Sequence, residues 1–436
     1  MNLAGKKVVI YGAGVSGLSA YQLVREHGGH AVIYDDNPTK SHSTSCTGVF
    51  KDCDVIVLSP GVPSGSPIVQ DARLEGRLVI SELELASSFC RAEQIAVTGT
   101  NGKTTATLLI DHILKTARVS SHAVGNIGAA FSAIADRLDA METAVIEASS
   151  FQLESALNFA PDTAVMLNVT PDHLERHGDM ARYIGAKARI FLRQSECDFA
   201  VYNADDANVV SLEPIMRAQK IPFSVTRPVD GAYISSGFVC YKGRPVVEVC
   251  ELDFAGRELE DVLAAVAVTA NKGISFYYIA AALLTFKRPD FRRKECGVVE
   301  GIYVFNDSKA TNVYSTISAG ESMDGDTVLI LGGAKRAEDF GELFRNMPSA
   351  VKGAVVVGEN SDDILTAARE ADFYDIKRSP TLEDACADAI EMAHELDCRN
   401  VLFSPSSKSY DNYTSYSERG RAFDAAIARL SGKGQR

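Results

Sequence analysis

The sequence lacks several features that would place it in a specialised class of protein. Its nine cysteines are odd in number and form no C-x-x-C pair, which argues against a disulfide framework or a structural zinc site. It has no apolar run of about 18 residues and no apolar leader before its first glycine loop. We therefore expect a cytoplasmic protein with reduced cysteines and without a membrane-spanning helix.

The sequence also has fewer basic than acidic residues. The net charge of −13 argues against a surface for nucleic acid or for an anionic membrane, although an acidic balance names no partner by itself. The 436 residues predict two to four domains, at about 100 to 200 residues each. A hydrophobic content of 46% is typical of a globular protein. We find no internal repeat and no low-complexity segment.

The most informative stretch is a glycine loop, Val97–Thr105, with the sequence VTGTNGKTT. It follows a short apolar strand pattern and opens a helical one, so its backbone N–H groups and the positive end of a helix would attract an anion. Lys103 would contact phosphate oxygens, and the Thr104 hydroxyl would be a magnesium ligand. Because Val97 stands where the general phosphate loop has its first glycine, an ordinary turn remains an alternative.

The chain begins with a second glycine loop. A strand pattern at Lys7–Tyr11 leads into Gly12–Gly17, a G-x-G-x-x-G motif, and a helix to about His27. The next predicted strand, Ala31–Tyr34, ends where a dinucleotide-binding fold places the acidic residue that binds the ribose. NAD binding and close packing of helix on sheet are both compatible with these glycines. The downstream phosphate loop and a domain that closes near residue 91 argue against a dehydrogenase.

Residues 92–287 alternate strand and helix patterns, which predicts a doubly wound parallel sheet. Apolar runs at Thr143–Ala148 and Thr163–Val169 are followed by polar residues that include Glu147 and His173. Ligands of such sheets bind at the carboxyl ends of the strands. Glu147 and His173 are therefore expected to face the same crevice as the phosphate loop.

Two further stretches concern a possible site lysine and the start of a third domain. Tyr183–Leu192 has a helical pattern that carries Lys187 among small apolar neighbours, and the residues alone favour a solvated surface lysine over a packed one. Lys287–Asp290 has the composition of a charged linker, which predicts a third domain from residue 288. The strands expected in that domain lie at Tyr303–Phe305, Val328–Leu331, Ala354–Val357 and Val401–Phe403.

Five separated motifs agree in order and spacing with one family. They are Gly99–Thr105, Gly125–Gly128, Glu147–Glu154, Asp172-His173 and Asn306–Asn312. With the Rossmann-like beginning, they make nearly the whole chain similar to the Mur ligases, and in particular to those that add D-glutamate. The resemblance implies an α/β protein of three domains: a Rossmann-like domain for the UDP substrate (1–91), a central P-loop ATPase-like parallel-sheet domain for ATP (92–287), and a C-terminal Rossmann-like α/β domain for the amino acid (288–436).

The implied activity is that of an ATP-dependent amide ligase in cytoplasmic peptidoglycan precursor synthesis. ATP would phosphorylate the carboxylate of UDP-N-acetylmuramoyl-L-alanine, and the amine of D-glutamate would attack the resulting acyl phosphate. The cofactors implied are ATP, two magnesium ions and carbon dioxide bound as a lysine carbamate, and the expected state is a monomer. A similar ligase for another carboxylate and amino acid, a catalytically silent nucleotide-binding relative and an oxidoreductase are the alternatives.

The resemblance also implies roles for individual residues. Lys103, Glu147, His173 and Lys187 would be catalytic, and Thr104, Glu147, His173 and the carbamate of Lys187 would hold magnesium. ATP would contact Gly99, Thr100, Asn101, Gly102, Lys103, Thr104, Thr105, Arg292, Arg293, Asn306, Asp307 and Lys309. The UDP substrate would contact Gly14, Val15, Ser16, Asp35, Asp36, Ser59, Gly61, Asn126, Ser149, Gln152 and His173. D-glutamate would contact Thr311, Lys335, Arg336, Ser409, Tyr410 and Tyr416.

The chain departs from the family pattern in the parts expected to bind ATP and D-glutamate. Arg292–Glu295 stands where relatives carry Pro-His-Arg-x-Glu, and Ala255–Asp261 replaces a Gly-x-His-Asn-x-x-Asn element. The lysine expected after the double glycine is either Lys335, one position early, or Arg336. Ser406–Ser409 is more polar than the family's small apolar run. These departures put the nucleotide contacts and the identity of the amino acid in doubt.

Overall fold

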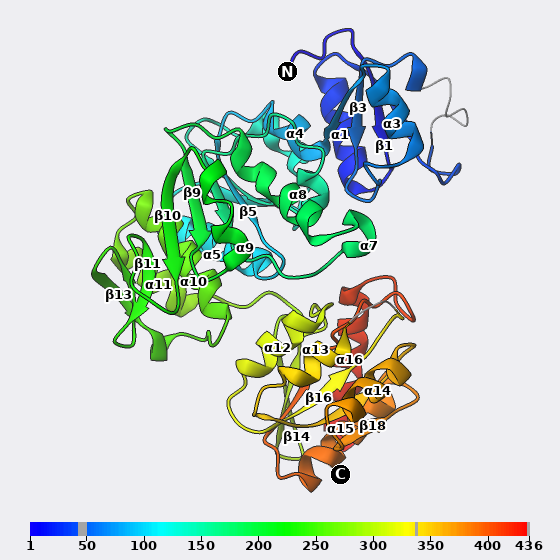
Figure 1. Cartoon of the computed structure of the whole chain (residues 1–436), viewed down its shortest axis with the longest axis vertical. Helices are drawn as coiled ribbons and strands as arrows, with labels where there is room; N and C mark the ends of the chain where they lie inside the picture. The colour runs from blue at the N-terminus through cyan, green and yellow to red at the C-terminus, as the bar shows by residue number, and fades with distance from the viewer. Residues whose placement is uncertain (42–49, 336–338, 434–436) are drawn as a thin grey trace. The chain divides into compact units, whose positions relative to one another are not determined.

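The computed structural model describes residues 1–41, 50–335 and 339–433, which fold into three separate α/β sheets (Figure 1). The chain divides into two compact units. Unit 1 comprises Met1–Leu252 and Glu260–Phe286, and unit 2 comprises Asp253–Leu259 and Lys287–Arg436. No helix in the described part of the chain is long and apolar enough to cross a bilayer. The α/β class expected from the sequence is confirmed.

The first sheet of unit 1 has four parallel strands in the order β2-β1-β3-β4. Its elements are β1 (Lys7–Tyr11), α1 (Val15–Glu26), β2 (His30–Tyr34), β3 (Val55–Leu58), α3 (Pro67–Leu74), β4 (Leu78–Ser81) and α4 (Glu82–Ser87). The strands are apolar on both faces, because α1 and α4 cover one side and α3 covers the other. The predicted strand, glycine loop, helix and second strand at the start of the chain are confirmed.

The second sheet of unit 1 has nine strands in the order β13-β12-β11-β10-β9-β8-β5-β7-β6. Its strands are β5 (Glu93–Thr98), β6 (Ser121–Gly125), β7 (Thr143–Glu147), β8 (Thr163–Met166), β9 (Phe199–Asn203), β10 (Gln219–Ser224), β11 (Ala232–Ser235), β12 (Phe238–Tyr241) and β13 (Arg244–Glu248). Its α-helices are α5 (Lys103–Thr116), α6 (Ser150–Leu153), α7 (Leu174–His177), α8 (Met180–Leu192), α9 (Ala207–Val210), α10 (Glu258–Asn271) and α11 (Phe276–Thr285). β5 lies between β7 and β8, so the phosphate loop leaves the sheet from its interior.

The expectation of an entirely parallel central sheet is wrong at one edge. β11 to β13 run antiparallel to one another. They are joined by two-residue turns, Ser236-Gly237 and Lys242-Gly243, in which every residue has a positive φ of 45° to 81°. Turns of this kind match the twist of an antiparallel hairpin, which explains why the chain reverses here instead of crossing over through a helix.

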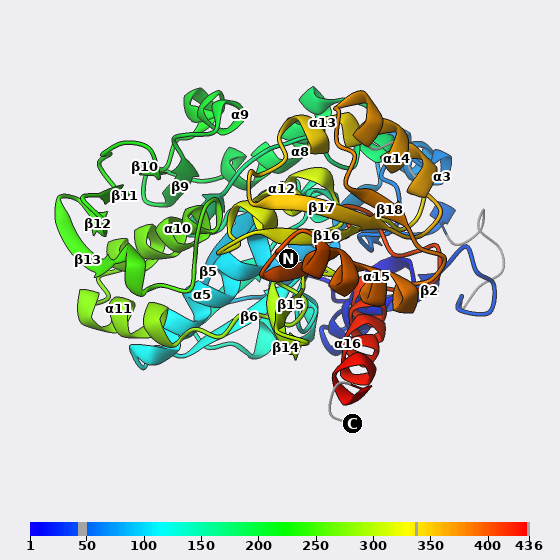
Figure 2. The same cartoon turned by 90° about the horizontal axis from the view of Figure 1, so that it is seen from below.

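The sheet of unit 2 has six strands in the order β14-β15-β19-β16-β17-β18. Its elements are β14 (Lys294–Val299), β15 (Ile302–Asn306), α12 (Val313–Glu321), β16 (Thr327–Leu331), α13 (Phe340–Arg345), β17 (Val351–Val356), α14 (Ser361–Glu370), β18 (Ile376–Arg378), α15 (Leu382–Glu395), β19 (Asn400–Phe403) and α16 (Tyr416–Lys433). Side chains alternate between two cores, so α15 and α16 pack on one face and α12 to α14 on the other (Figure 2). The four strands predicted for this part are confirmed as β15, β16, β17 and β19.

The predicted charged linker at Lys287–Asp290 is part of the body of unit 2. Arg288 has a side chain only 11% exposed and forms ion pairs with Asp253 and Glu258. The segment that contains these two acids lies earlier in the sequence and belongs to the same unit. The residues that precede the sheet of unit 2 are therefore held by ion pairs and do not form a solvent-exposed linker.

Candidate functional site

The phosphate loop connects β5 to α5 and is held by neighbouring backbone. The N–H of Thr100 donates to the carbonyl of Asn168 at 2.9 Å, and the N–H of Asn101 donates to the Asn168 side-chain oxygen at 2.9 Å. Gly102 caps α5 with a φ of 81°, and a Cβ there would lie 2.0 Å from Oδ1 of Asp261. Only glycine fits this position, since both the conformation and the space exclude a side chain.

Lys103 folds back over its own loop. Its Nζ lies 3.0 Å from the carbonyl oxygen of Gly99 and 2.8 Å from that of Thr100. The next residues, Thr104 and Thr105, are buried in the first turn of α5. The ammonium group is thus held at the mouth of the loop, beside the amino end of a 14-residue helix that attracts anions.

The structure brings three predicted residues together at the end of β7. Glu147 is 2% exposed, and its carboxylate accepts hydrogen bonds from Thr104 Oγ1 at 2.8 Å and from Asn126 Nδ2 at 2.7 Å. A hydroxyl and a carboxylate are ligands that magnesium prefers. Within the described ranges, no three His, Cys, Asp or Glu side chains converge on a common point. This donor set fits a magnesium ion that binds mainly through nucleotide phosphates.

Lys187 is buried beneath the phosphate loop, so the interpretation as a surface lysine is wrong. It is 1% exposed, its Nζ donates to the carbonyl of Gly99 at 2.6 Å, and the ammonium lies 4.7 Å from the ring centre of Tyr183. Burial lowers the pKa of Lys187 well below its usual value, and the nearby charge of Lys103 lowers it further. A neutral amine is the form of lysine that reacts with carbon dioxide.

His173 lies immediately before α7, with a φ of 55°. Its Nε2 is 3.6 Å from an Asp172 carboxylate oxygen, and its ring packs on Phe151 with 4.8 Å between ring centres. Phe151 belongs to α6, which starts three residues after the end of β7. His173 is therefore placed near the carboxyl edge of the central sheet, as the sequence predicted.

The residues predicted to bind the UDP substrate surround the first glycine loop. Asp35 accepts a hydrogen bond from the Ala13 N–H at 2.7 Å, which lowers the pKa of its carboxyl group, and Asp36 accepts one from the Tyr11 hydroxyl. Ser59 donates to the carbonyl of Gly12 at 2.9 Å. Gly14, Val15, Ser16 and Gly61 complete the part of the predicted set that lies within residues 1–91, and Val15 is 73% exposed. The first glycine loop is therefore exposed to solvent and lies next to the charged carboxylate of Asp35.

Part of the fingerprint serves packing. A Cβ at Gly17 would lie 1.8 Å from the carbonyl oxygen of Gly12, so glycine here lets α1 approach the sheet. Ser149 and Gln152 are similarly engaged in structure. They form a reciprocal capping box at α6, in which the Ser149 N–H donates to Gln152 Oε1 at 2.9 Å. Their side chains fix the helix that carries Phe151.

Arg176 was not predicted as a site residue, although it lies only three residues after the Asp172-His173 motif. Its guanidinium donates to the carbonyls of Pro60 at 3.0 Å and Val62 at 2.8 Å, pairs with Glu154 at 3.2 Å, and stacks 4.1 Å from the ring centre of Phe151. The loop at 59–63 carries two of the residues predicted to bind the UDP substrate. Arg176 therefore ties that loop to the central sheet next to His173.

We expect Arg176→Ala to lower the free energy of unfolding of unit 1 by about 2–4 kcal/mol, because it breaks two charged hydrogen bonds and strands a partly buried Glu154. Denaturant unfolding of the full chain measures this change. Arg182→Ala is the matched control, since the Arg182 side chain is 76% exposed and, among the described residues, forms an ion pair with Asp179 alone. Its expected effect is below about 0.5 kcal/mol, and equal effects of the two changes would refute the assignment.

The ATP residues predicted in the C-terminal part are clustered within unit 2. Asp307 is buried, accepts hydrogen bonds from the Arg293 N–H at 3.2 Å and Ser404 Oγ at 3.0 Å, and has a pKa raised to about 6 by burial despite the charge of Arg292. Lys309 Nζ lies 5.4 Å from the ring centre of Tyr416. The geometry thus groups residues predicted for ATP with one predicted for D-glutamate.

Asn306 has a structural role that its motif did not reveal. Its side chain is fully buried, and Nδ2 donates to the carbonyl of Gly420 at 2.9 Å and to Asp424 Oδ1 at 2.6 Å. Both acceptors lie on α16. Asn306 therefore joins the end of β15 to the last helix, which fixes the backbone that leads into Asp307.

Two departures from the family pattern contact one another. Glu258, from the altered stretch 255–261, pairs with Arg293 of the altered stretch 292–295 at 3.2 Å and with Arg288. Arg257, next to it, pairs with Glu321 at 3.3 Å. The altered stretches therefore form one charged network at the start of unit 2, and their changes are physically coupled.

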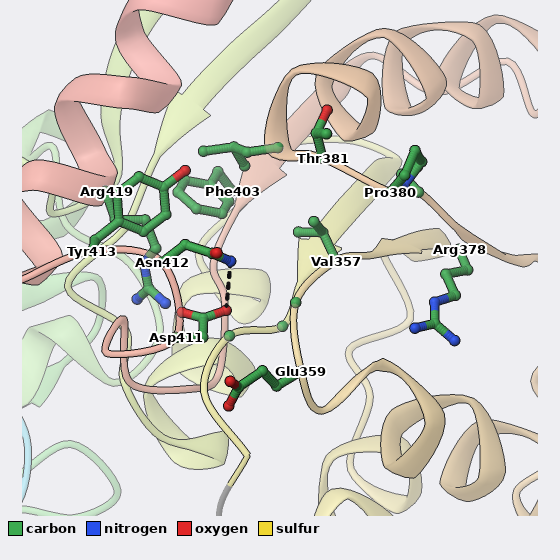
Figure 3. A pocket seen from close by; sticks show the side chains of 15 residues that line it. Val357, Glu359, Arg378, Pro380, Thr381, Phe403, Asp411, Asn412, Tyr413 and Arg419 are labelled. Carbon is green, nitrogen blue, oxygen red and sulfur yellow. Dashed lines mark hydrogen bonds between the residues drawn. The ribbon is translucent and has the colours of Figure 1, made fainter.

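A cavity of about 530 Å³ opens at the carboxyl ends of β16, β17 and β18 (Figure 3). The carboxylates of Asp411 and Glu359 lie toward one end and Arg378 toward the other, and Asn412 donates to Asp411 at 3.3 Å. Thr311, Lys335, Ser409, Tyr410 and Tyr416, predicted for D-glutamate, do not line it. Arg336, the other candidate, lies outside the described residues.

The remaining D-glutamate candidates differ in accessibility. Ser409 is buried and Tyr410 is 70% exposed, while Thr311 lies just before α12. The Lys335 N–H donates to Glu359 at 3.2 Å, and its ammonium lies 3.6 Å from Asp363. The Lys335 side chain is 67% exposed, so its ammonium remains accessible beside these acids and its predicted role stays a prediction.

Comparison with known proteins relates the chain to one family. The profile of the Mur ligase middle domain matches residues 97–242. The UDP-N-acetylmuramoylalanine–D-glutamate ligase of Pelotomaculum thermopropionicum is 38% identical over 448 residues, with 98% of each chain covered. The enzyme of that name from Desulfitobacterium hafniense is 36% identical, over 98% of this chain and 99% of its own.

A solved structure has the same fold. The UDP-N-acetylmuramate–alanine ligase of Thermotoga maritima aligns with a TM-score of 0.61 over 97% of this chain and 99% of its own, at 19% identity. At this level of identity the likeness concerns the fold alone. The site itself must be argued from its residues.

Proposed function

The chain belongs to the Mur ligase family, and from this premise we propose that it joins D-glutamate to UDP-N-acetylmuramoyl-L-alanine at the expense of ATP. Its relatives of 36–38% identity carry the name of that ligase over almost their whole length. The product is a peptidoglycan precursor, so we place the reaction in cytoplasmic cell-wall synthesis, on which cell shape and division depend. The enzyme would act as a monomer.

The observation that carries this proposal is the cluster at the phosphate loop. Lys103, Thr104, Glu147 and Lys187 come from three different parts of the chain and lie within hydrogen-bond reach of one loop or of each other. A structural turn would need no buried carboxylate and no buried amine there. The cluster has the charges and oxygen donors that phosphoryl transfer to a carboxylate requires.

In this proposal each residue of the site has a separate role. Lys103 binds terminal phosphate oxygens of ATP, and Thr104 and Glu147 hold a magnesium ion on them. His173 and Lys187, as its carbamate, hold a second magnesium ion beside the acceptor carboxylate. When bound, these ions neutralise charge on the phosphates and on the carboxylate. The carboxylate attacks the terminal phosphorus of ATP, and ADP leaves as the bond to its oxygen breaks. The D-glutamate amine then attacks the acyl carbon, loses a proton and displaces phosphate, which leaves the amide.

The carbamate is supported by the surroundings of Lys187. The adduct converts a buried cation into an anion with two oxygens, which can support a magnesium ion where an ammonium would repel it. Formation of the adduct requires a neutral amine, and burial depresses the pKa of Lys187 in the needed direction. The nearby Lys103 charge would also favour the anionic product.

We assign the substrates to three domains with the boundaries 1–91, 92–287 and 288–436. The UDP substrate would bind the exposed loop at Gly14–Ser16 with Asp35 and Ser59. D-glutamate would bind in the C-terminal part with Thr311, Ser409 and Tyr416. The four-, nine- and six-stranded sheets fall inside these ranges, but Asp253–Leu259 clusters with the C-terminal unit.

The decisive test is phosphate release from ATP with magnesium and UDP-N-acetylmuramoyl-L-alanine. D-glutamate is added, withheld or replaced by L-glutamate in parallel reactions. We expect release only with both substrates and with a strong preference for the D isomer. Release with another amino acid alone would contradict the substrate assignment, and no release despite ATP binding would favour a silent relative.

A further inference from the structure

Asp261 places a carboxylate directly against the phosphate loop. It lies in the second turn of α10, is 6% exposed and belongs to unit 1 with the loop. Its Oδ1 is 2.0 Å, and its Oδ2 2.9 Å, from the point where a Cβ on Gly102 would stand. No other side chain comes as close to that point. The bare glycine thus lets the carboxylate reach the backbone where α5 begins.

The residue beside it extends the same arrangement. Glu260 Oε2 lies 3.4 Å from Nδ2 of Asn168, the residue whose side-chain oxygen holds the N–H of Asn101. Two consecutive acids of α10 therefore approach the loop from one side. Both belong to the stretch 255–261, in which this chain departs from the family's asparagine-containing element.

A carboxylate in this position has a defined electrostatic consequence. The amino end of α5 and the ammonium of Lys103 create a positive potential that attracts anions. The carboxylate of Asp261 offsets part of this potential. An incoming triphosphate meets a fixed negative charge near its binding place. Repulsion between them is largest when the phosphates carry their full charge and smaller when a divalent cation neutralises part of it.

We propose that Asp261 is a specificity residue that selects the metal complex of a nucleoside triphosphate over the metal-free form. The inference rests on the proposed function, because it takes the phosphate loop to be the ATP site. In this view Asp261 weakens binding of free ATP more than it weakens binding of MgATP. The loop is then kept from capturing ATP that cannot react.

The test is calorimetric titration of ATP into the full chain, with excess EDTA or with excess magnesium. Asp261→Asn preserves the shape of the side chain and removes its charge. We expect the Kd for metal-free ATP to fall about tenfold in this variant, a usual size for one like-charge contact, and the Kd for MgATP, which keeps about half of the negative charge, to fall only about threefold. Adenosine, which lacks phosphates, should bind both proteins equally.

Glu196→Gln is the matched control, because it removes one negative charge from an exposed turn of the same unit. It should leave all three affinities unchanged. If Asp261→Asn does not fold, which thermal unfolding reveals, Asp261→Ser is measured in the same way. A similar shift for free ATP and MgATP, or no shift, would overturn the inference. A wild-type chain that binds neither form would instead overturn the proposed nucleotide function.

Discussion

Replacing Lys187 by alanine should lower ligase turnover by about 10²–10³-fold, the usual cost of removing one preorganised group that stabilises charge at a reacting centre. Lys187 is 1% exposed and reaches the phosphate loop at Gly99, so its removal takes away the buried amine that the proposed carbamate needs. The fold should survive, because the change also removes the cost of burying an amine. Phosphate release at saturating substrates measures the loss, and circular dichroism checks the fold.

Two variants separate a carbamate from a simple cation. Lys187→Arg keeps a positive charge but cannot form the adduct, and it should be as inactive as the alanine variant. Acetate or formate at high concentration should restore part of the activity of Lys187→Ala alone, by supplying carboxylate oxygens in the vacated space. Lys115→Ala, a control at a 56% exposed lysine, should remain active. Undiminished turnover in Lys187→Ala would disprove the assignment.

Local signals in the sequence were sufficient for the elements that position the site. The strand, glycine loop and helix patterns around Gly12 and Gly102 are continuous in the chain, and the structure has them at β1–α1 and β5–α5. The strands β11 to β14 were missed. Two-residue turns with a final glycine and positive φ join them: Ser236-Gly237 connects β11 to β12, Lys242-Gly243 connects β12 to β13, and Glu300-Gly301 connects the missed β14 to the predicted β15. Dipeptides of this kind are typical of β-hairpins, whereas the prediction considered parallel strands that are joined by helices.

The burial of Lys187 could have been predicted from helical spacing. Tyr183, Lys187 and Ile190 lie at i, i+4 and i+7 on α8 and are all buried, so the lysine shares the packed face. The contacts of Arg176 and Asp261 carry no such local signal. Each depends on segments that are distant in sequence, with Asp261 facing Gly102 and Arg176 reaching Pro60. Tertiary structure alone brings these groups together.

Glu147→Gln should also reduce turnover by about 10²–10³-fold, for a reason different from that at Lys187. The glutamine keeps the size of the side chain and can still accept the hydrogen bond that Thr104 donates to Glu147 at 2.8 Å. It removes the negative charge that would hold magnesium on the ATP phosphates. Raising the magnesium concentration should therefore recover part of the activity, which titration of the reaction with magnesium would measure.

Substitutions at Thr104 show whether the hydrogen bond or the charge is essential. Thr104→Ser keeps the hydroxyl and should retain most activity, while Thr104→Val removes it and should raise the magnesium requirement. If Glu147 acted only as a hydrogen-bond acceptor for Thr104 and Asn126, Glu147→Gln would lose about 1 kcal/mol of stability and little turnover. A large loss of turnover with normal unfolding, relieved by magnesium, would instead make the carboxylate charge the feature that this site requires.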